Sequence, residues 1–336
     1  MATSKEIDKT YLSIDNAEER GFIHRDYIAH CFRWSHVIKF LQQQHRFKDA
    51  RILDLGCGKE APLLKTMYTS KMAPYQYTGL DYNQININDC IEKAANKCVD
   101  GAVLLSNYDI SIDRDGIING QHNIITSFEV FEHMTPRKLM ELLKRMITGL
   151  TPGSDIFVST PNFNGSAAAN HHNEMTQDFL TELFEAFGFK IKKKYGTFAS
   201  QKDYMNEIRK DGYENLFDRL CEYYDSNIVA VIFAPLYPNF SRNVMWHMTP
   251  HGLMDQEKIA DVIEKYFDQQ QDFDGWRNVM EDRSNRPQWN YKKIFDNNIS
   301  EEDKNKLFMF VSGYKIGLAV GREKKGADRN ATAIII

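Results

Sequence analysis

Strand-like and helix-like segments alternate from residue 51 to residue 198, and this alternation limits the possible folds more than any other feature of the chain. The expected strands cover residues 51–55, 76–81, 102–106, 122–128, 155–160, 189–198 and 242–248. The expected helices cover residues near 60–69, 87–97, 136–149 and 177–187. Strands that alternate with helices pair in parallel through right-handed crossovers. The sequence therefore predicts an α/β protein with a doubly wound sheet.

The boundaries of two predicted helices carry recognisable residues. Thr135 precedes Pro136, and Thr176 precedes the next apolar stripe, so both threonines are expected to cap the N-termini of helices. Gly149 and Gly188 lie where these helices should end and strands begin.

The chain divides into three predicted regions. Residues 1–50 contain a predicted amphipathic helix over 26–45, and residues 51–250 form the sheet domain with an insertion at 200–240. The insertion is expected to hold a helix near 213–225. Residues 251–336 form a more polar appendage with apolar segments at 257–267 and 305–319.

Charge and composition exclude several classes of protein. The 336-residue chain has 42 Lys and Arg against 46 Asp and Glu, a net charge of -4, which does not favour a non-specific grip on nucleic acid. Its 5 cysteines contain no CxxC pair, so we expect neither a disulfide framework nor a structural zinc site. The longest apolar stretch, 228–237, is too short to cross a bilayer, and the first residues lack a signal-peptide pattern. We expect a cytoplasmic protein without a membrane partner, and its oligomeric state stays open.

A glycine-rich turn comes directly after the first predicted strand. Residues 56–61 fit the dinucleotide pattern G-x-G-x-x-G/A, and Asp81 stands about where that pattern places a ribose-binding acid. Taken alone, the pattern predicts NAD. The turn is flanked by Asp54 and Glu60, however, and carboxylates disfavour a pyrophosphate but suit a cofactor with positive charge, such as S-adenosylmethionine. An NAD-dependent dehydrogenase remains the alternative.

Five segments in order carry a family resemblance. They are ILDLGCG at 52–58, YTGLDYN at 77–83, NIITSFEVFEHM at 123–134, IFVSTPN at 156–162 and NEMTQDFLTELFEAFGFKI at 173–191. Together they resemble the class I S-adenosylmethionine-dependent methyltransferases, particularly the group related to the ubiquinone-biosynthesis O-methyltransferases. The resemblance covers about 50–200 and, more weakly, 240–248. It implies a Rossmann-like, mostly parallel sheet with an antiparallel last strand, and a methyl-transferring activity with S-adenosylmethionine as cofactor.

The resemblance also implies where the cofactor binds. Gly56, Cys57 and Gly58 would line its methionine part, with Asp54 near the amino group. Asp81 would accept hydrogen bonds from the two ribose hydroxyls, because a carboxylate offers two acceptor oxygens.

Further cofactor contacts are expected from neighbouring strand ends. Tyr82 would pack against the adenine and Asp109 would bind its amino group, while Ser127 and Phe128 would lie under the sulfonium. The helix before the first strand is a candidate lid, and its candidate residues are Tyr27, Arg33 and Trp34, although Tyr27 and Trp34 also suit a core position.

Three histidines are candidates for a catalytic general base, because imidazole titrates near neutral pH. They are His133, at a strand end, and His171 and His172, after the next strand. His133 also suits a packing role at the start of a helix. His171, His172 and Glu174 offer metal-ligating groups, but no distant third ligand is evident in the sequence, so we expect no metal.

Residues just after the fourth strand limit the identity of the methyl acceptor. A D/N-P-P-Y/F motif, typical of DNA amino-methyltransferases, is absent there, as is the Pro-Cys pair of a cytosine-C5 enzyme. We expect a hydroxyl or amine on a small molecule to be the acceptor. A nucleotide or a base or sugar of RNA or DNA, reached through the insertion, is the alternative, and a noncatalytic cofactor-binding module is another.

Overall fold

The computed structural model describes residues 25–93, 102–110, 112, 116–118, 121–151, 153–198 and 201–284. Its sheet has seven strands in the order β3-β2-β1-β4-β5-β7-β6. The strands are β1 (Arg51–Leu55), β2 (Gln76–Asp81), β3 (Ala102–Asn107), β4 (Ile124–Phe128), β5 (Asp155–Pro161), β6 (Phe189–Phe198) and β7 (Asn243–Pro250). The first five strands pair in parallel, whereas β7 runs antiparallel between β5 and β6. The predicted doubly wound sheet with an antiparallel last strand is confirmed.

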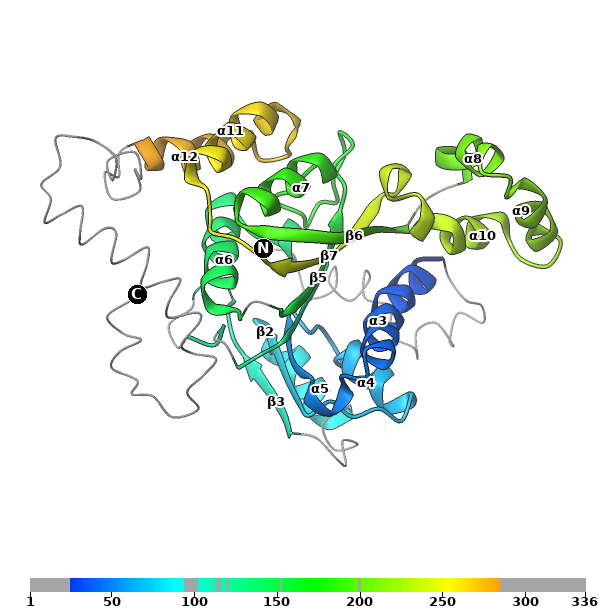
Figure 1. Cartoon of the computed structure of the whole chain (residues 1–336), viewed down its shortest axis with the longest axis horizontal. Coiled ribbons are helices and arrows are strands. Elements are labelled where there is room, and N and C mark those ends of the chain that lie inside the picture. The colour runs from blue at the N-terminus through cyan, green and yellow to red at the C-terminus, as the bar shows by residue number, and fades with distance from the viewer. Residues whose placement is uncertain are drawn as a thin grey trace, which may run out of the picture.

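Helices cover both faces of this sheet (Figure 1). The described helices are α3 (Arg25–Gln43), α4 (Pro62–Thr69), α5 (Gln84–Lys93), α6 (Pro136–Gly149), α7 (Gln177–Ala186), α8 (Gln201–Lys210), α9 (Glu214–Cys221), α10 (Ser226–Phe233), α11 (Gln256–Tyr266) and α12 (Phe273–Ser284). Short 3-10 turns include η3 (Phe131–His133) and η6 (Phe267–Gln269).

The alternation of side chains along each strand divides the core in two. On β1, Leu53 and Leu55 face the cluster that includes α6, α7, α11 and α12. Ile52 faces the opposite cluster, which α3, α4 and α5 complete. Both faces of the central strands are therefore buried, as parallel sheets require.

Of the two predicted threonine caps, one forms the expected hydrogen bond and the other does not. Thr176 caps α7 as expected, because its side chain accepts a hydrogen bond from the backbone N–H of Phe179. Thr135 precedes α6, but its side chain makes no capping hydrogen bond, so the proline at position 136 is the start signal that the structure retains.

The insertion between β6 and β7 is helical and has an apolar cluster of its own. The predicted helix near 213–225 is confirmed as α9, which ends at Cys221. A further helix, α10, begins just beyond the predicted range and is capped by Asp225, which accepts a hydrogen bond from the backbone N–H of Asn227. The cluster includes Tyr204, Phe217 and Phe233. Helix α10 packs against α3, so the insertion and the N-terminal helix support each other.

The described part of the C-terminal appendage shares the main core. Trp276 of α12 is fully buried and lies 4.7 Å, ring centroid to ring centroid, from Phe179 of α7. Residues 251–284 therefore pack on the sheet domain, while the predicted segment 305–319 lies outside the described residues. The division of the chain into three regions stays a prediction.

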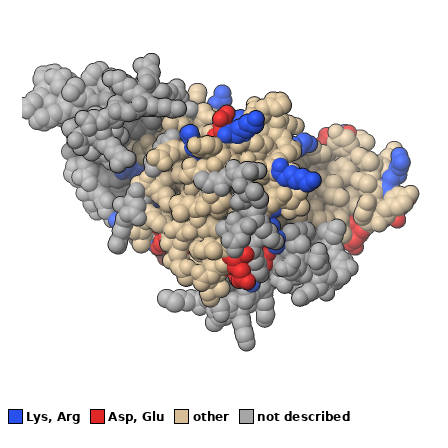
Figure 2. Space-filling model, turned by 90° about the horizontal axis from the view of Figure 1, so that it is seen from below, with Lys and Arg blue, Asp and Glu red and all other residues tan. Residues whose placement is uncertain are grey.

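No helix within the described part of the chain is long and apolar enough to cross a membrane. On the face drawn in Figure 2, blue and red side chains are interspersed among neutral ones over the described residues.

Candidate functional site

The glycine turn after β1 is shaped by its contacts with neighbouring strands. Gly56 has φ of 73°, and a Cβ at this residue would lie 2.5 Å from Cγ2 of Val130. Glycine is therefore required by both backbone conformation and close packing. The next glycine of the pattern, Gly58, donates its N–H to Oδ2 of Asp81 at 3.0 Å.

Asp81 ends β2 beside this turn, as the sequence predicts. Its Oδ1 accepts from the backbone N–H of Asn83 at 2.8 Å and from Nδ2 of Asn86 at 3.2 Å. Burial raises the pKa of Asp81, and the hydrogen bonds from Asn83, Gly58 and Asn86 oppose that rise. The structure thus brings the carboxylate and the turn together at the carboxyl edge of the sheet, where ligands of such folds bind.

Asp54 lies near the end of β1 and bonds to side chains of two neighbouring strands. Its Oδ2 accepts from the hydroxyl of Tyr77 at 2.5 Å, and its Oδ1 accepts from Oγ1 of Thr126 at 2.7 Å. Burial raises its pKa to about 6 despite these bonds. Each carboxylate oxygen accepts a hydrogen bond inside the protein, so Asp54 links β1 to β2 and β4. Its place near the amino group of the cofactor stays a prediction.

The other predicted cofactor residues lie in varied surroundings. Tyr82 is 70% exposed beside Asp81, and Asp109 is exposed with its carboxylate 3.9 Å from Nζ of Lys138. Ser127 is fully buried, and its Oγ has no hydrogen-bond partner among the described residues. Phe128 is partly buried against the cluster that contains α3.

Of the three predicted lid residues of helix α3, Arg33 contacts the residues that follow β4 and those of β5. Arg33 is buried, with Nη1 3.0 Å from Oε1 of Glu129 and 3.3 Å from Oγ of Ser159. Trp34 is buried in the core beside α4, which favours the packing role foreseen for it. The side chain of Tyr27 lies outside the described residues.

Glu129, which the sequence analysis did not single out, is held by three side chains. Besides Arg33, Ser159 donates to its Oε1 at 2.8 Å and Asn243 donates to its Oε2 at 2.5 Å. Its φ of 57° is in the left-handed region, which non-glycine residues adopt at an energetic cost. The chain turns sharply here, immediately after β4.

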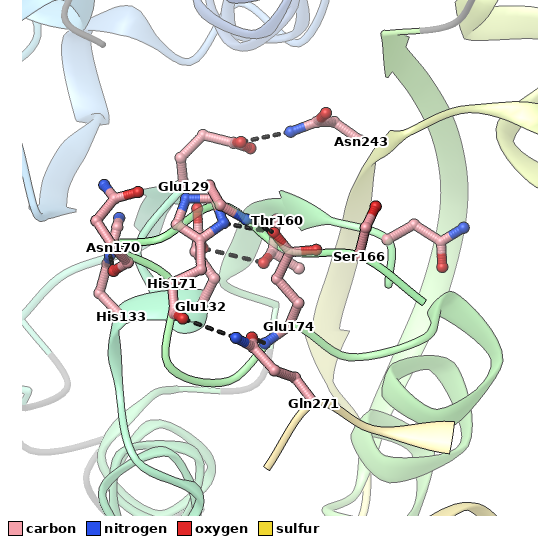
Figure 3. A network of polar contacts seen from close by, with 12 residues as sticks. Glu129, Glu132, His133, Thr160, Ser166, Asn170, His171, Glu174, Asn243 and Gln271 are labelled. Atoms are coloured by element: carbon pink, nitrogen blue, oxygen red, sulfur yellow. Dashed lines mark hydrogen bonds and ion pairs between the residues drawn. The ribbon is translucent and has the colours of Figure 1, made fainter. Parts of the chain in front are cut away.

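Three side chains beyond this turn form a group that can ligate a metal. One carboxylate oxygen of Glu132 and one ring nitrogen each of His133 and His171 lie within 4.8 Å of one another. Figure 3 shows these side chains pointing toward one another from η3 and from the loop after β5. The group lies at the carboxyl ends of β4 and β5, the same edge of the sheet as Asp81 and the glycine turn.

Glu132 is the buried member of this group. Its Oε2 accepts from Oγ1 of Thr160 at 3.0 Å, while its Oε1 has no partner among the described residues. Burial raises the pKa of Glu132 well above the ordinary value, and the neighbouring charge of Glu129 adds to this shift. A buried carboxylate oxygen without a donor is costly, and a cation would compensate it.

Both histidines of the group are oriented by hydrogen bonds at Nδ1. The Nδ1 of His133 lies 3.0 Å from the carbonyl oxygen of Asn170, and because a carbonyl only accepts, Nδ1 carries the proton. The Nδ1 of His171 lies 2.5 Å from Oε1 of Glu174. This arrangement leaves each Nε2 with a free lone pair, as in metal-ligating histidines.

Glu174 is fully buried and is held in turn by Arg242. The guanidinium Nη2 lies 2.7 Å from Oε2 of Glu174. Burial raises the pKa of this carboxyl, but hydrogen bonds from His171 and Arg242 outweigh it, so the pKa is below its ordinary value. Glu174 therefore stays ionised and orients His171. The ring of His172 is exposed and is not a member of the group.

The expectation of no metal depended on the apparent lack of a ligand distant from His171. Glu132 and His133 offer ligand atoms of this kind in the fold, since they lie almost forty residues earlier in the chain. The available sequence signal was the spacing Glu-x-x-Glu-His at 129–133, directly after a predicted strand.

Comparisons with known proteins agree with this fold. The sequence model of a family described as "Methyltransferase domain" matches residues 27–194, half of the 336-residue chain. No curated protein matches the chain.

Solved structures provide weaker similarities. The methyltransferase domain of bacterial CtHen1 is 19% identical with a TM-score of 0.42, and 66% of this chain aligns with 99% of that one. Magnesium protoporphyrin IX methyltransferase from Synechocystis PCC 6803, with bound SAM, is 10% identical with a TM-score of 0.46, covering 73% of this chain and 91% of that one. A S-adenosylmethionine-dependent methyltransferase from Clostridium acetobutylicum ATCC 824 is 9% identical with a TM-score of 0.46, covering 74% and 99%.

These TM-scores are too low to assign the chain, and the assignment depends on the family match together with the strand order. The dehydrogenase alternative is set aside, because the matched region contains the glycine turn, Asp81 and the metal-ligating group. The chain belongs to the methyltransferase domain family and is an S-adenosylmethionine-dependent methyltransferase, EC 2.1.1.-.

Proposed function

We propose that this methyltransferase acts on a hydroxyl group and uses a divalent metal ion held by Glu132, His133 and His171. The observation that carries the proposal is the convergence of these three side chains within 4.8 Å at the ligand-binding edge of the sheet. The unpartnered buried oxygen of Glu132 and the two oriented imidazoles supply what a metal requires from its ligands.

A metal favours a hydroxyl acceptor over an amine. An amine at neutral pH can present its lone pair once it has lost one proton, but a hydroxyl is a poor nucleophile until it approaches the alkoxide. A bound divalent ion lowers the pKa of an oxygen that coordinates it, which is the chemistry this site would gain. The hydroxyl oxygen then attacks the methyl carbon opposite sulfur, the carbon–sulfur bond breaks, and the hydroxyl proton is released to water.

The donor side of the reaction is assigned to the glycine turn and Asp81. Asp81 accepts hydrogen bonds from Gly58, Asn83 and Asn86, which leaves one acceptor site on Oδ2 for a ribose hydroxyl of S-adenosylmethionine. Arg33 joins α3 to Glu129, which follows β4 at the same edge of the sheet. We therefore retain α3 as the candidate lid.

The acceptor is proposed to be a vicinal diol. Two histidines and one carboxylate leave coordination positions of a divalent ion open, and two neighbouring oxygens of one molecule can occupy two of them. The cis-diol of a ribose meets this description, whether in a free nucleoside or at the 3′ end of an RNA chain. A catechol meets it as well.

Radiolabelled methyl transfer tests the proposal. Purified protein with S-adenosylmethionine and Mn²⁺ is offered a nucleoside, a short RNA with a 3′-terminal diol, the same RNA with a 2′-deoxy end, and a catechol. We expect transfer to at least one diol, loss of transfer on chelation, and recovery with added metal.

Alanine variants of the two histidines test the same proposal through the methyl-transfer rate and cofactor binding. His133→Ala and His171→Ala should reduce the methyl-transfer rate at least 100-fold while binding S-adenosylmethionine as the wild type does. Transfer that is equally fast with excess chelator would overturn the metal, and transfer to amines but to no diol would overturn the acceptor class.

A further inference from the structure

The loop that carries His171 is fastened from outside the matched methyltransferase region. The family match ends at residue 194, yet Gln271, which lies between η6 and α12, contacts this loop directly. Figure 3 shows Gln271 beside Glu174 and His171, reaching the site from the C-terminal appendage. The appendage has no role in the function proposed above.

The side chain of Gln271 forms hydrogen bonds to the backbone at both ends of the four-residue turn from His171 to Glu174. Its Nε2 donates to the carbonyl oxygen of His171 at 2.8 Å, and its Oε1 accepts from the backbone N–H of Glu174 at 2.7 Å. Its own backbone N–H donates to the carbonyl oxygen of Glu174 at 3.1 Å. The two ends of this turn, His171 and Glu174, are also joined by the 2.5 Å contact between Nδ1 and Oε1 that orients the imidazole.

The position of Gln271 is itself firmly fixed. The preceding Gln270 is fully buried, donates to the carbonyl oxygen of Tyr266 at 2.7 Å and accepts from the backbone N–H of Thr176 at 3.0 Å. On the other side, the indole N–H of buried Trp276 donates to Oδ1 of Asn173 at 2.9 Å. The appendage thus contacts the loop at residues 171, 173, 174 and 176.

Resting on the metal-dependent function proposed above, we infer that Gln271 is a positioning residue for the metal ligand His171, and that residues 256–284 are a working part of the active site. Gln271 acts through the backbone of the loop, and its contacts fix the distance between His171 and Glu174. Groups hydrogen-bonded to a metal-ligating imidazole commonly change metal affinity 10- to 100-fold when replaced. Gln271 holds the backbone of Glu174, which is such a group for His171.

The test compares two neighbouring glutamines. Gln271→Met keeps side-chain length but removes both side-chain hydrogen bonds to the 171–174 turn. Gln270→Met is the matched control, because it also removes two hydrogen bonds, and these fasten Thr176 and Tyr266 instead. Each variant is titrated with Mn²⁺ and, separately, with S-adenosylmethionine by calorimetry.

Gln271→Met should bind Mn²⁺ about 10- to 100-fold more weakly than the wild type, with unchanged affinity for S-adenosylmethionine. Gln270→Met should keep the Mn²⁺ affinity within about twofold, even if its thermal unfolding temperature falls. Gln271→Glu, which keeps an acceptor for Glu174 but loses the donor to His171, should give an intermediate Mn²⁺ affinity.

Other outcomes would overturn the inference in distinguishable ways. Wild-type Mn²⁺ affinity in Gln271→Met, together with its loss in His171→Ala, would leave the metal site standing and remove the role of Gln271. Loss of S-adenosylmethionine binding in Gln271→Met and Gln271→Glu would assign Gln271 to general stability. A wild-type protein that binds no Mn²⁺ would overturn the metal-dependent function as well.

Discussion

Asp54 and Asp81 flank the same glycine turn, but their hydrogen bonds give them different tasks. The two carboxylate oxygens of Asp54 accept hydrogen bonds from Tyr77 and Thr126, which lie on the two neighbouring strands. Asp81 receives its donors mainly from the turn and from the residues just after β2, so it stays at the edge of the sheet. Asp54 therefore links three strands, whereas Asp81 links the turn to the end of β2, where we propose that the cofactor ribose binds.

Replacing Asp81 should weaken cofactor binding without unfolding the protein. We expect Asp81→Asn to cost roughly 1.5–3 kcal/mol of S-adenosylmethionine affinity, because charge-assisted hydrogen bonds to the ribose are lost. Calorimetry measures the affinity and thermal denaturation checks the fold. Asp89→Asn, which changes an acid on the neighbouring helix α5, is the control and should bind normally. Unchanged affinity in Asp81→Asn would remove Asp81 from the cofactor site.

At single residues, the sequence predicted position correctly where a local pattern determines it. The glycine at residue 56 and the acid at residue 81 are predictable from the strand–turn–helix pattern alone. The role of Glu132 could not be predicted in this way, because its surroundings come from β5 and from the loop around residue 171. Burial and a missing donor are properties of the tertiary structure.

At the scale of elements, α3 is the part whose attachment depends most clearly on protonation. Its His36 packs with Tyr195 at 4.3 Å and with Phe157 at 6.0 Å between ring centroids. Burial, together with the charges of His247, Lys193 and Lys39, lowers the pKa of His36 to about 4. Protonation therefore opposes the docking of α3, which also carries Arg33.

The free energy of unfolding should fall as the pH falls from about 6.5 toward 4. The unfolded chain binds a proton at His36 near pH 6.5, whereas the folded chain binds it only near pH 4, so acid favours the unfolded chain. We expect His36→Phe to lessen this loss by about 2 kcal/mol in urea denaturation across that range. His251→Phe, at an exposed residue, is the control. A pH profile of His36→Phe that parallels the wild type would contradict this role.

Element boundaries were predicted to within a few residues where one local signal decides them. The strand at 189–198 and the helix at 136–149 agree with the structure, because apolar periodicity and flanking glycines determine both. The helix expected near 213–225 already ends at Cys221, and Asp225 caps a separate helix, α10, that begins just beyond the expected range. The contact of α12 with the 171–176 loop could not be foreseen, since it joins segments about a hundred residues apart.

At the scale of the whole molecule, the order of the strands sets the site. The carboxyl ends of β2, β1, β4 and β5 lie side by side, so Asp81, the glycine turn and the proposed metal ligands share one edge. The alternation of strands and helices predicted this edge. The helix before β1 and the histidines after β4 and β5 were also expected at this edge. The contact of the C-terminal appendage with the loop after β5 was not.

Electron spin-echo spectroscopy of the protein loaded with one Mn²⁺ tests the central claim most directly, because it detects nitrogen nuclei bound to the metal. We predict coupling to two imidazole nitrogens in the wild type and to one in His171→Ala. We also predict weak or absent Mn²⁺ binding in Glu132→Gln, whose neutral amide removes the buried charge. A spectrum of bound Mn²⁺ without imidazole nitrogen, or one that His171→Ala leaves unchanged, would contradict the account.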